Sequence, residues 1–128
     1  MFNKTIGLAL AGLAFALAGT QAAQADYPER AVTVIVPFSA GGNTDTIARI
    51  VSDHLSKELG QPVVIENRGG GGGTVGAALA AKADPDGYTL LFATAGSHSV
   101  NPILREVSYD PIADFSPVST AVVSSVLI

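Results

Sequence analysis

Residues 31–45 read Ala-Val-Thr-Val-Ile-Val-Pro-Phe-Ser-Ala-Gly-Gly-Asn-Thr-Asp. The run 32–36 is β-branched and apolar except at its second position, which is typical of a strand buried on both faces of a parallel sheet. The glycines that follow predict a break before a helix over residues 44–59, for which Gly60 is a natural stop. The expected buried stripe of this helix consists of Ile47, Ile50, Val51, Leu55 and Leu59. The stretch therefore predicts a buried strand, a glycine loop and an amphipathic helix.

Strands continue to alternate with helices further along the chain. The remaining expected elements are a strand at 62–66, a flexible glycine turn at 69–73, an alanine-rich helix at 74–83, a strand at 88–93, a short helix at 102–106 and a strand at 118–128. Alternation at this spacing implies right-handed βαβ crossovers and a parallel or mixed sheet flanked by helices. The sequence therefore predicts an α/β fold.

The amino-terminal residues 1–25 have the pattern of a secretory signal peptide. Lys4 provides the positive start, residues 6–18 form an apolar run, and Ala23-Gln24-Ala25 matches a small-residue cleavage site. The apolar run is short for a bilayer-spanning helix, so a retained membrane anchor is the less favoured alternative. We expect a protein that is exported from the cytoplasm, starts at Asp26, does not span the membrane and forms at most one compact unit over residues 26–128.

Composition narrows the classes of partner. The formal net charge is −4, and the acidic residues are scattered rather than clustered, which gives no support for nucleic-acid binding. The chain contains no cysteine, so disulfides and thiolate metal sites are excluded. A small anionic ligand would have to be held by local hydrogen-bond donors and helix ends, because the overall field slightly repels it.

The loop between the first strand and the first helix is the leading candidate for such a site. In open α/β sheets, ligands bind beyond the carboxyl ends of the strands, where helix N-termini present unpaired N–H groups and partial positive charge. A carboxylate is the natural guest there. Alternatively, Asn43, Thr44 and Asp45 only cap the helix. The predicted binding residues in this loop are Phe38, Ser39, Ala40, Gly41, Gly42, Thr44 and Asp45.

A second candidate loop, residues 94–101, follows the third expected strand and carries hydroxyl, imidazole and amide groups. Ser97 and His98 are its predicted ligand contacts. His98 could act as a base only with a nucleophile and an orienting acid beside it, so ligand contact is favoured over catalysis. His54 is predicted to be a packing residue. The two histidines lie far apart without a cluster of other ligands, so no metal site is expected.

The glycine run contains Gly71-x-Gly73-x-x-Gly76, which matches the dinucleotide-binding fingerprint. That fingerprint requires a carboxylate about 20 positions later, where this chain reads Leu90-Leu91-Phe92-Ala93-Thr94. A nucleotide-binding domain is therefore the less favoured alternative, and no cofactor is expected. We interpret the run as a mobile loop near the mouth of a cleft, or else a plain turn. The Gly-x-Ser-x-Gly elbow of α/β hydrolases is also absent, so no enzymatic activity is expected.

Together these segments resemble the Bug (TctC-like) family, the extracytoplasmic solute receptors of tripartite tricarboxylate transporters. The resemblance covers the whole chain after the leader. The segments that carry it are Tyr27-Pro28, Val34-Ile35-Val36-Pro37-Phe38-Ser39-Ala40-Gly41-Gly42-Asn43-Thr44-Asp45, Ala48-Arg49, Gly60-Gln61-Pro62-Val63-Val64, Glu66-Asn67-Arg68, Pro85-Asp86-Gly87-Tyr88-Thr89-Leu90-Leu91, Asn101-Pro102 and Tyr109-Asp110-Pro111.

The resemblance implies a type II periplasmic-binding-protein fold, in which two α/β domains close on a small carboxylate and deliver it to membrane transporter subunits. It implies that loop 38–45 lines the site and that Ser97 and His98 lie on a neighbouring loop. Family members carry a second domain beyond the point where this chain ends. We therefore expect this chain to form the first part of domain 1 and to bind carboxylates less well than a full-length member. We also expect it to be a monomer. An exported carboxylate-sensing or interaction module that is not coupled to transport is the alternative.

Overall fold

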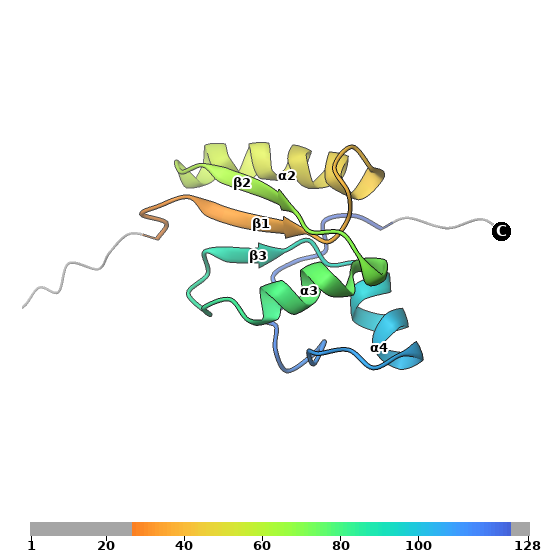
Figure 1. Ribbon diagram of the computed structural model, residues 1–128. Helices are drawn as coiled ribbons and strands as arrows, with labels where there is room; N and C mark the ends of the chain where they lie inside the picture. The colour runs from red at the N-terminus through yellow and green to blue at the C-terminus, as the bar shows by residue number, and fades with distance from the viewer. Residues whose placement is uncertain (1–26, 124–128) are drawn as a thin grey trace, which may run out of the picture.

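The computed structural model describes residues 27–123 and shows one parallel sheet flanked by helices (Figure 1). The strands β1 (Val32–Val36), β2 (Val63–Asn67) and β3 (Thr89–Leu91) lie in the order β2-β1-β3. Val32 pairs with Val63, and Thr33 pairs with Thr89. The expected sheet is therefore present and is parallel throughout. β1 is its central strand.

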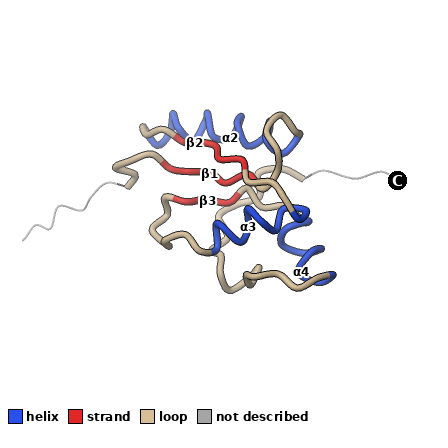
Figure 2. The backbone as a smooth tube through the Cα atoms, in the orientation of Figure 1, coloured by secondary structure: helices blue, strands red, loops and turns tan. Residues whose placement is uncertain are grey.

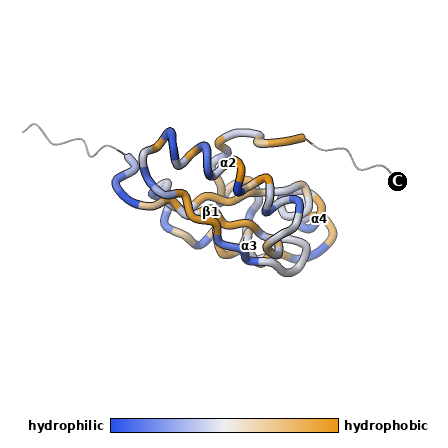
Figure 3. The backbone as a smooth tube through the Cα atoms, turned by 90° about the horizontal axis from the view of Figure 1, so that it is seen from above, coloured by the Kyte–Doolittle hydropathy of each residue, from blue (hydrophilic) through white to orange (hydrophobic). Residues whose placement is uncertain are grey.

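β1 forms the centre of the hydrophobic core. Four of its five residues are at most 5% exposed, and only Thr33 is half-buried. Helices α2 (Asn43–Leu59) and α3 (Thr74–Ala81) lie on either side of this hydrophobic strand (Figure 3). The crossover from β1 to β2 runs through α2, and the crossover from β2 to β3 runs through α3 in the opposite direction across the sheet. Two right-handed crossovers in opposite directions place their helices on opposite faces of a sheet. The prediction of a strand buried on both faces is confirmed.

The buried stripe of α2 differs from the predicted one. The residues that face the sheet most closely are Asp45, Ala48 and Ser52, whereas Ile50 is 58% exposed. The helix approaches the sheet along small and polar side chains, and this rotates the apolar residues at Ile47, Val51, Leu55 and Leu59 to partly buried positions. Including Ile50 in the stripe was wrong. The prediction that His54 is a packing residue was also wrong, because the side chain is exposed.

The carboxyl-terminal third of the described chain departs further from the predictions. A π-helical turn η2 (Gly96–Val100) runs into a one-turn helix α4 (Asn101–Leu104), where a helix was expected only over 102–106. Residues 118–123 form no strand, and Val118 and Val123 are each 86% exposed. A β-prone sequence becomes a strand only when a neighbouring strand pairs with it, and the described residues offer no such pairing. The expected strand over 118–128 was therefore wrong for 118–123.

Two predictions fall outside the described residues. They are the signal peptide at 1–25 and the last part, 124–128, of the expected final strand. Over residues 27–123, none of the helices combines the length and the apolar character that crossing a bilayer requires.

Candidate functional site

The three loops that leave the carboxyl ends of the strands meet at one edge of the sheet (Figure 2). The turn η1 (Gly71–Gly73) joins β2 to α3 and packs between the other two loops. A Cβ atom built on Gly73 would lie 3.2 Å from the Cβ of Ser97 and 3.4 Å from Cζ of Phe38. The fold therefore brings the predicted residues Phe38 and Ser97 to the same place, although they are far apart in the sequence.

The first loop presents its backbone to solvent at the start of α2. Ser39, Ala40, Gly41 and Gly42 are exposed, and Gly41 has a φ of +82° that favours glycine. Gly42 is the N-cap, and no side chain caps the helix. The alternative that Asn43, Thr44 and Asp45 only cap the helix is therefore wrong. The helix N-terminus offers backbone donors of the kind that bind anions.

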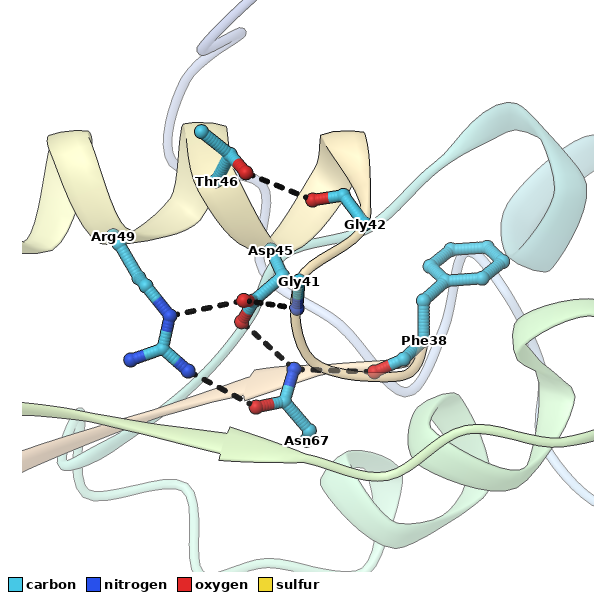
Figure 4. A network of polar contacts seen from close by, with 7 residues as sticks. All are labelled: Phe38, Gly41, Gly42, Asp45, Thr46, Arg49 and Asn67. Atoms are coloured by element: carbon cyan, nitrogen blue, oxygen red, sulfur yellow. Dashed lines mark hydrogen bonds and ion pairs between the residues drawn. The ribbon is translucent and has the colours of Figure 1, made fainter.

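The Asp45 carboxylate lies between Gly41, Arg49 and Asn67 and holds this loop in place (Figure 4). The residue is only 2% exposed. Its Oδ2 accepts hydrogen bonds from the Arg49 Nε at 2.9 Å and the Gly41 N–H at 2.8 Å, and its Oδ1 accepts one from the Asn67 Nδ2 at 2.9 Å. The hydrogen bond from Arg49, followed by those from Gly41 and Asn67, holds the pKa of Asp45 well below its usual range. Both carboxylate oxygens are thus occupied by the protein itself.

Asn67, at the end of β2, is a site residue that the sequence analysis did not single out. Its Nδ2 also donates to the main-chain oxygen of Phe38 at 3.1 Å, and its Oδ1 accepts from the Arg49 Nη2 at 3.3 Å. The Phe38 ring points away from this network (Figure 4). The available signal was positional, because Asn67 is a polar residue at the carboxyl end of a strand, where α/β proteins build their sites.

Ser97 lies inside the third loop, residues 94–101, which follows β3, and its hydrogen bonds hold that loop together. The residue is fully buried, its Oγ accepts a hydrogen bond from the Thr94 N–H at 3.1 Å, and it donates to the Thr94 main-chain oxygen at 3.0 Å. The Oγ also lies 3.0 Å from the His98 Nδ1. A nucleophile–base pair would have this spacing, but a hydroxyl without solvent exposure cannot meet a substrate. The Ser97 side chain therefore shapes the loop rather than lining its surface.

His98 is half-buried in an aromatic cluster. Its ring packs edge-to-face on Phe115 with the centroids 4.6 Å apart, and lies tilted against Tyr109 at 6.2 Å. Burial lowers the pKa of His98 below its usual value, so the imidazole is neutral at neutral pH. His98 can therefore offer a ligand a neutral hydrogen-bonding group but not a positive charge.

Asn101 is a second residue that the sequence analysis did not assign to the site. Its buried Nδ2 donates to the Gly72 oxygen and to the Gly96 oxygen, each at 2.9 Å. It thereby joins the glycine turn to the third loop. The signal for it was again only positional, since an asparagine in a loop region is usually explained by its turn preference.

The glycines of the dinucleotide-like motif serve close packing. A Cβ on Gly76 would lie 2.8 Å from the Arg68 oxygen and from Cα and Cβ of Pro37. Gly73 and Gly76 are both buried. The plain-turn alternative therefore describes the run better than a mobile loop, because the turn is packed between its neighbours. Over residues 27–123, no group of three or more His, Cys, Asp or Glu residues is placed to hold a metal ion.

The ionised state of Asp45 predicts an acid-dependent loss of stability. Its folded-state pKa lies below the unfolded value. Its contribution is therefore present above the unfolded pKa of about 4 and is lost progressively as the pH falls from there toward the lower folded-state pKa. We expect Asp45→Asn to flatten the decline of the free energy of unfolding below about pH 4, as measured by urea titration across pH. Asp84→Asn, in an exposed turn, is the control. An unchanged decline in Asp45→Asn would contradict the assignment.

Comparison with known proteins identifies a matching family and several similar proteins. A family model described as "Tripartite tricarboxylate transporter family receptor" matches residues 47–128. Protein BugT of Bordetella pertussis is 41% identical over 121 residues, covering 91% of this chain and 37% of the relative. A UPF0065 protein of Agrobacterium vitis, from the TAR-I ttuE-ttuC' intergenic region, is 51% identical over 96 residues, covering 75% and 28%. The chain thus spans about a third of the length of these relatives.

Solved structures show the same architecture. MatC from Rhodopseudomonas palustris with bound malate superposes with a TM-score of 0.67 at 46% identity, covering 71% of this chain and 31% of that one. The Rpa4515 protein of R. palustris with adipate gives a TM-score of 0.64 at 44% identity, covering 67% and 29%. A structure described as a periplasmic transporter gives 0.65 at 56% identity, covering 67% and 29%. The predicted periplasmic-binding-protein-like α/β fold, with a parallel sheet flanked by helices, is confirmed. The resemblance noted from the sequence is confirmed as well, and the chain belongs to the TctC (Bug) family of tripartite tricarboxylate transporter receptors.

Proposed function

We propose that this protein contributes one wall of a periplasmic carboxylate-binding site and serves a tripartite tricarboxylate-type transporter. The observation that carries the proposal is the exposed backbone of residues 39–42 at the N-terminus of α2, which hydrogen bonds to Asp45 and Asn67 hold in place. Malate and adipate, the molecules named with two of the similar structures, are both small dicarboxylates. Periplasmic location and delivery to membrane subunits belong to the same proposal and rest on the family and on the expected signal peptide.

The main chain supplies most of the attraction in this proposal. Hydrogen bonds to a charged acceptor contribute about 1.5–3 kcal/mol each, and a helix N-terminus adds about 0.3–2 kcal/mol. The Gly41 N–H is already bonded to Asp45, so the ligand would use the amides of its neighbours Ser39, Ala40 and Gly42 and of Thr44. Phe38 would provide apolar contact and His98 a neutral hydrogen bond. Asp45 and Ser97 would then act by holding the loops.

Affinity should be low for the 128-residue chain. Water exclusion strengthens polar contacts to a bound anion, and the chain supplies about 30% of the length of the proteins solved with malate and adipate. A ligand on the described loops is therefore gripped from one side. We expect dissociation constants on the order of millimolar for both acids, well above those of the longer proteins.

An NMR titration tests this proposal. Malate and adipate, added up to about 50 mM, should shift the backbone amides of residues 39–44 and 96–98, and the uncharged diamide of adipic acid should leave them in place. The diamide is the matched control because it keeps the length of the ligand and one carbonyl acceptor at each end but lacks its charge. Shifts confined to other parts of the sheet, or equal shifts with the diamide, would refute a carboxylate site at these loops.

A further inference from the structure

We propose that Asp45, Arg49 and Asn67 form a latch that sets the conformation of the ligand loop without touching the ligand. The three side chains come from the first turn of α2, the next turn of α2 and the end of β2. This proposal rests on the proposed function, since it assigns positioning residues to the same site. Asn67 is not among the residues expected to contact the ligand.

The latch holds the loop at two points. The Asn67 Nδ2 donates to the Phe38 oxygen at 3.1 Å, and the Asp45 Oδ2 accepts from the Gly41 N–H at 2.8 Å. These two anchors flank the exposed residues Ser39 and Ala40. The orientation of the peptide groups between the anchors is therefore set by the side chains of Asp45 and Asn67, which bind the loop at both anchors (Figure 4).

A third contact closes the latch. The Asn67 Nδ2 also donates to the Asp45 Oδ1 at 2.9 Å, so the two anchors are bonded to each other. Arg49 bridges both, with its Nε on Asp45 at 2.9 Å and its Nη2 on Asn67 at 3.3 Å. It also balances the buried negative charge, which would otherwise oppose an anion at the same helix end. The described contacts thus form a closed ring of three side chains.

The composition of the loop gives a physical reason for this arrangement. Two adjacent glycines allow the backbone many conformations, and ordering them when the ligand binds would cost conformational entropy. A loop already held in one conformation avoids that cost, and this raises affinity without any new contact to the ligand. Buried polar networks with every group satisfied specify a single arrangement.

An exposed ion pair further along α2 provides a comparison for the Asp45–Arg49 pair. Asp53 and Lys57 form the same kind of i,i+4 pair on α2, with the Lys57 Nζ 2.6 Å from Asp53, but both side chains are 66% exposed and their contact joins only the two of them. Asp53→Asn is therefore the matched control for Asp45→Asn. Val34→Ala, in the core beneath α2, serves as a second control because it lowers stability without removing a loop contact.

Hydrogen exchange and ligand titration of the purified chain test the latch with separate readouts. In Asp45→Asn we expect the Gly41 amide to exchange about tenfold faster and the malate dissociation constant to rise about three- to tenfold. In Asn67→Ser, which keeps the Asp45–Arg49 pair, we expect faster exchange of the Gly41 amide with a similar loss of affinity. Asp53→Asn and Val34→Ala should leave both quantities unchanged under conditions where the variants are folded.

The outcomes separate this proposal from the proposed function. Unchanged exchange of the Gly41 amide in folded Asn67→Ser, or an equal increase in its exchange rate in Val34→Ala, would overturn the latch even when wild type binds malate. Faster loop exchange in the variants, with no malate shift in wild type, would support the latch as a structural device and refute the carboxylate site. If Asp45→Asn does not fold, Asn67→Ser alone decides between these results.

Discussion

Gly76→Ala is expected to destabilise the protein by about 3 kcal/mol, near the upper end for overpacking a tight contact. The added methyl group would lie 2.8 Å from the Arg68 oxygen and from two atoms of Pro37, which is closer than carbon and oxygen atoms approach without moving. Both neighbours are main-chain or proline-ring atoms, so neither can swing aside as a flexible side chain would. Urea unfolding followed by circular dichroism measures the change.

Helix propensity alone predicts the opposite sign for this variant. Within α3, alanine in place of glycine should stabilise by about 1 kcal/mol. The control is Ala78→Gly in the same helix, which should destabilise by about that amount and report propensity together with the loss of one methyl group. A neutral or stabilising Gly76→Ala would show that α3 does not press against Pro37 as the structure has it.

Asn101→Asp is expected to cost about 3 kcal/mol or more at neutral pH, because it replaces a buried donor with a charge of nearly the same shape. The Asn101 Nδ2 donates to two main-chain oxygens, those of Gly72 and Gly96. A carboxylate in that position would repel both oxygens. Chemical unfolding at pH 7 measures the loss, and faster hydrogen exchange across residues 70–73 and 96–100 should accompany it.

The control for Asn101→Asp is Asn43→Asp. Asn43 is exposed and is the first residue of α2, where a negative charge interacts favourably with the helix dipole by about 0.3–1 kcal/mol. The same chemical change should therefore be neutral or slightly stabilising there. Equal losses in the two variants would refute the role of Asn101 as the link between the glycine turn and the third loop.

Local sequence pattern predicted the structure correctly where the residues themselves favour one conformation strongly. The run at 32–36 is apolar on both alternations, and it became the central strand because no other arrangement buries both of its faces. Gly60 ends α2 as expected, and the structure shows that it does so in the left-handed conformation. Ile50 and the segment 118–123 were mispredicted, since hydrophobicity indicates that a residue prefers burial but not which neighbour is present to bury it.

The candidate site was less predictable for a related reason. Loop 38–45 could be located from the sequence, because it follows a buried strand and precedes a helix. The roles within it could not, since Asp45 points toward Asn67, which lies 22 positions away in the sequence. Ser97 was expected at the surface as a ligand contact, yet its hydroxyl is satisfied inside its own loop. Asparagines at 67 and 101 gave no signal that distinguishes a clamp from an ordinary turn residue.

By itself the sequence determined the α/β class, the central strand, the family and the loop at which a carboxylate is proposed to bind, because each of these depends on short-range pattern or on ordered motifs along the chain. Only the tertiary structure decided which side chains hold the loops and which remain free to meet a ligand. The physical reason is that a hydrogen bond needs its two groups within about 3 Å, and folding alone brings Asn67 to Phe38 and Asn101 to Gly72.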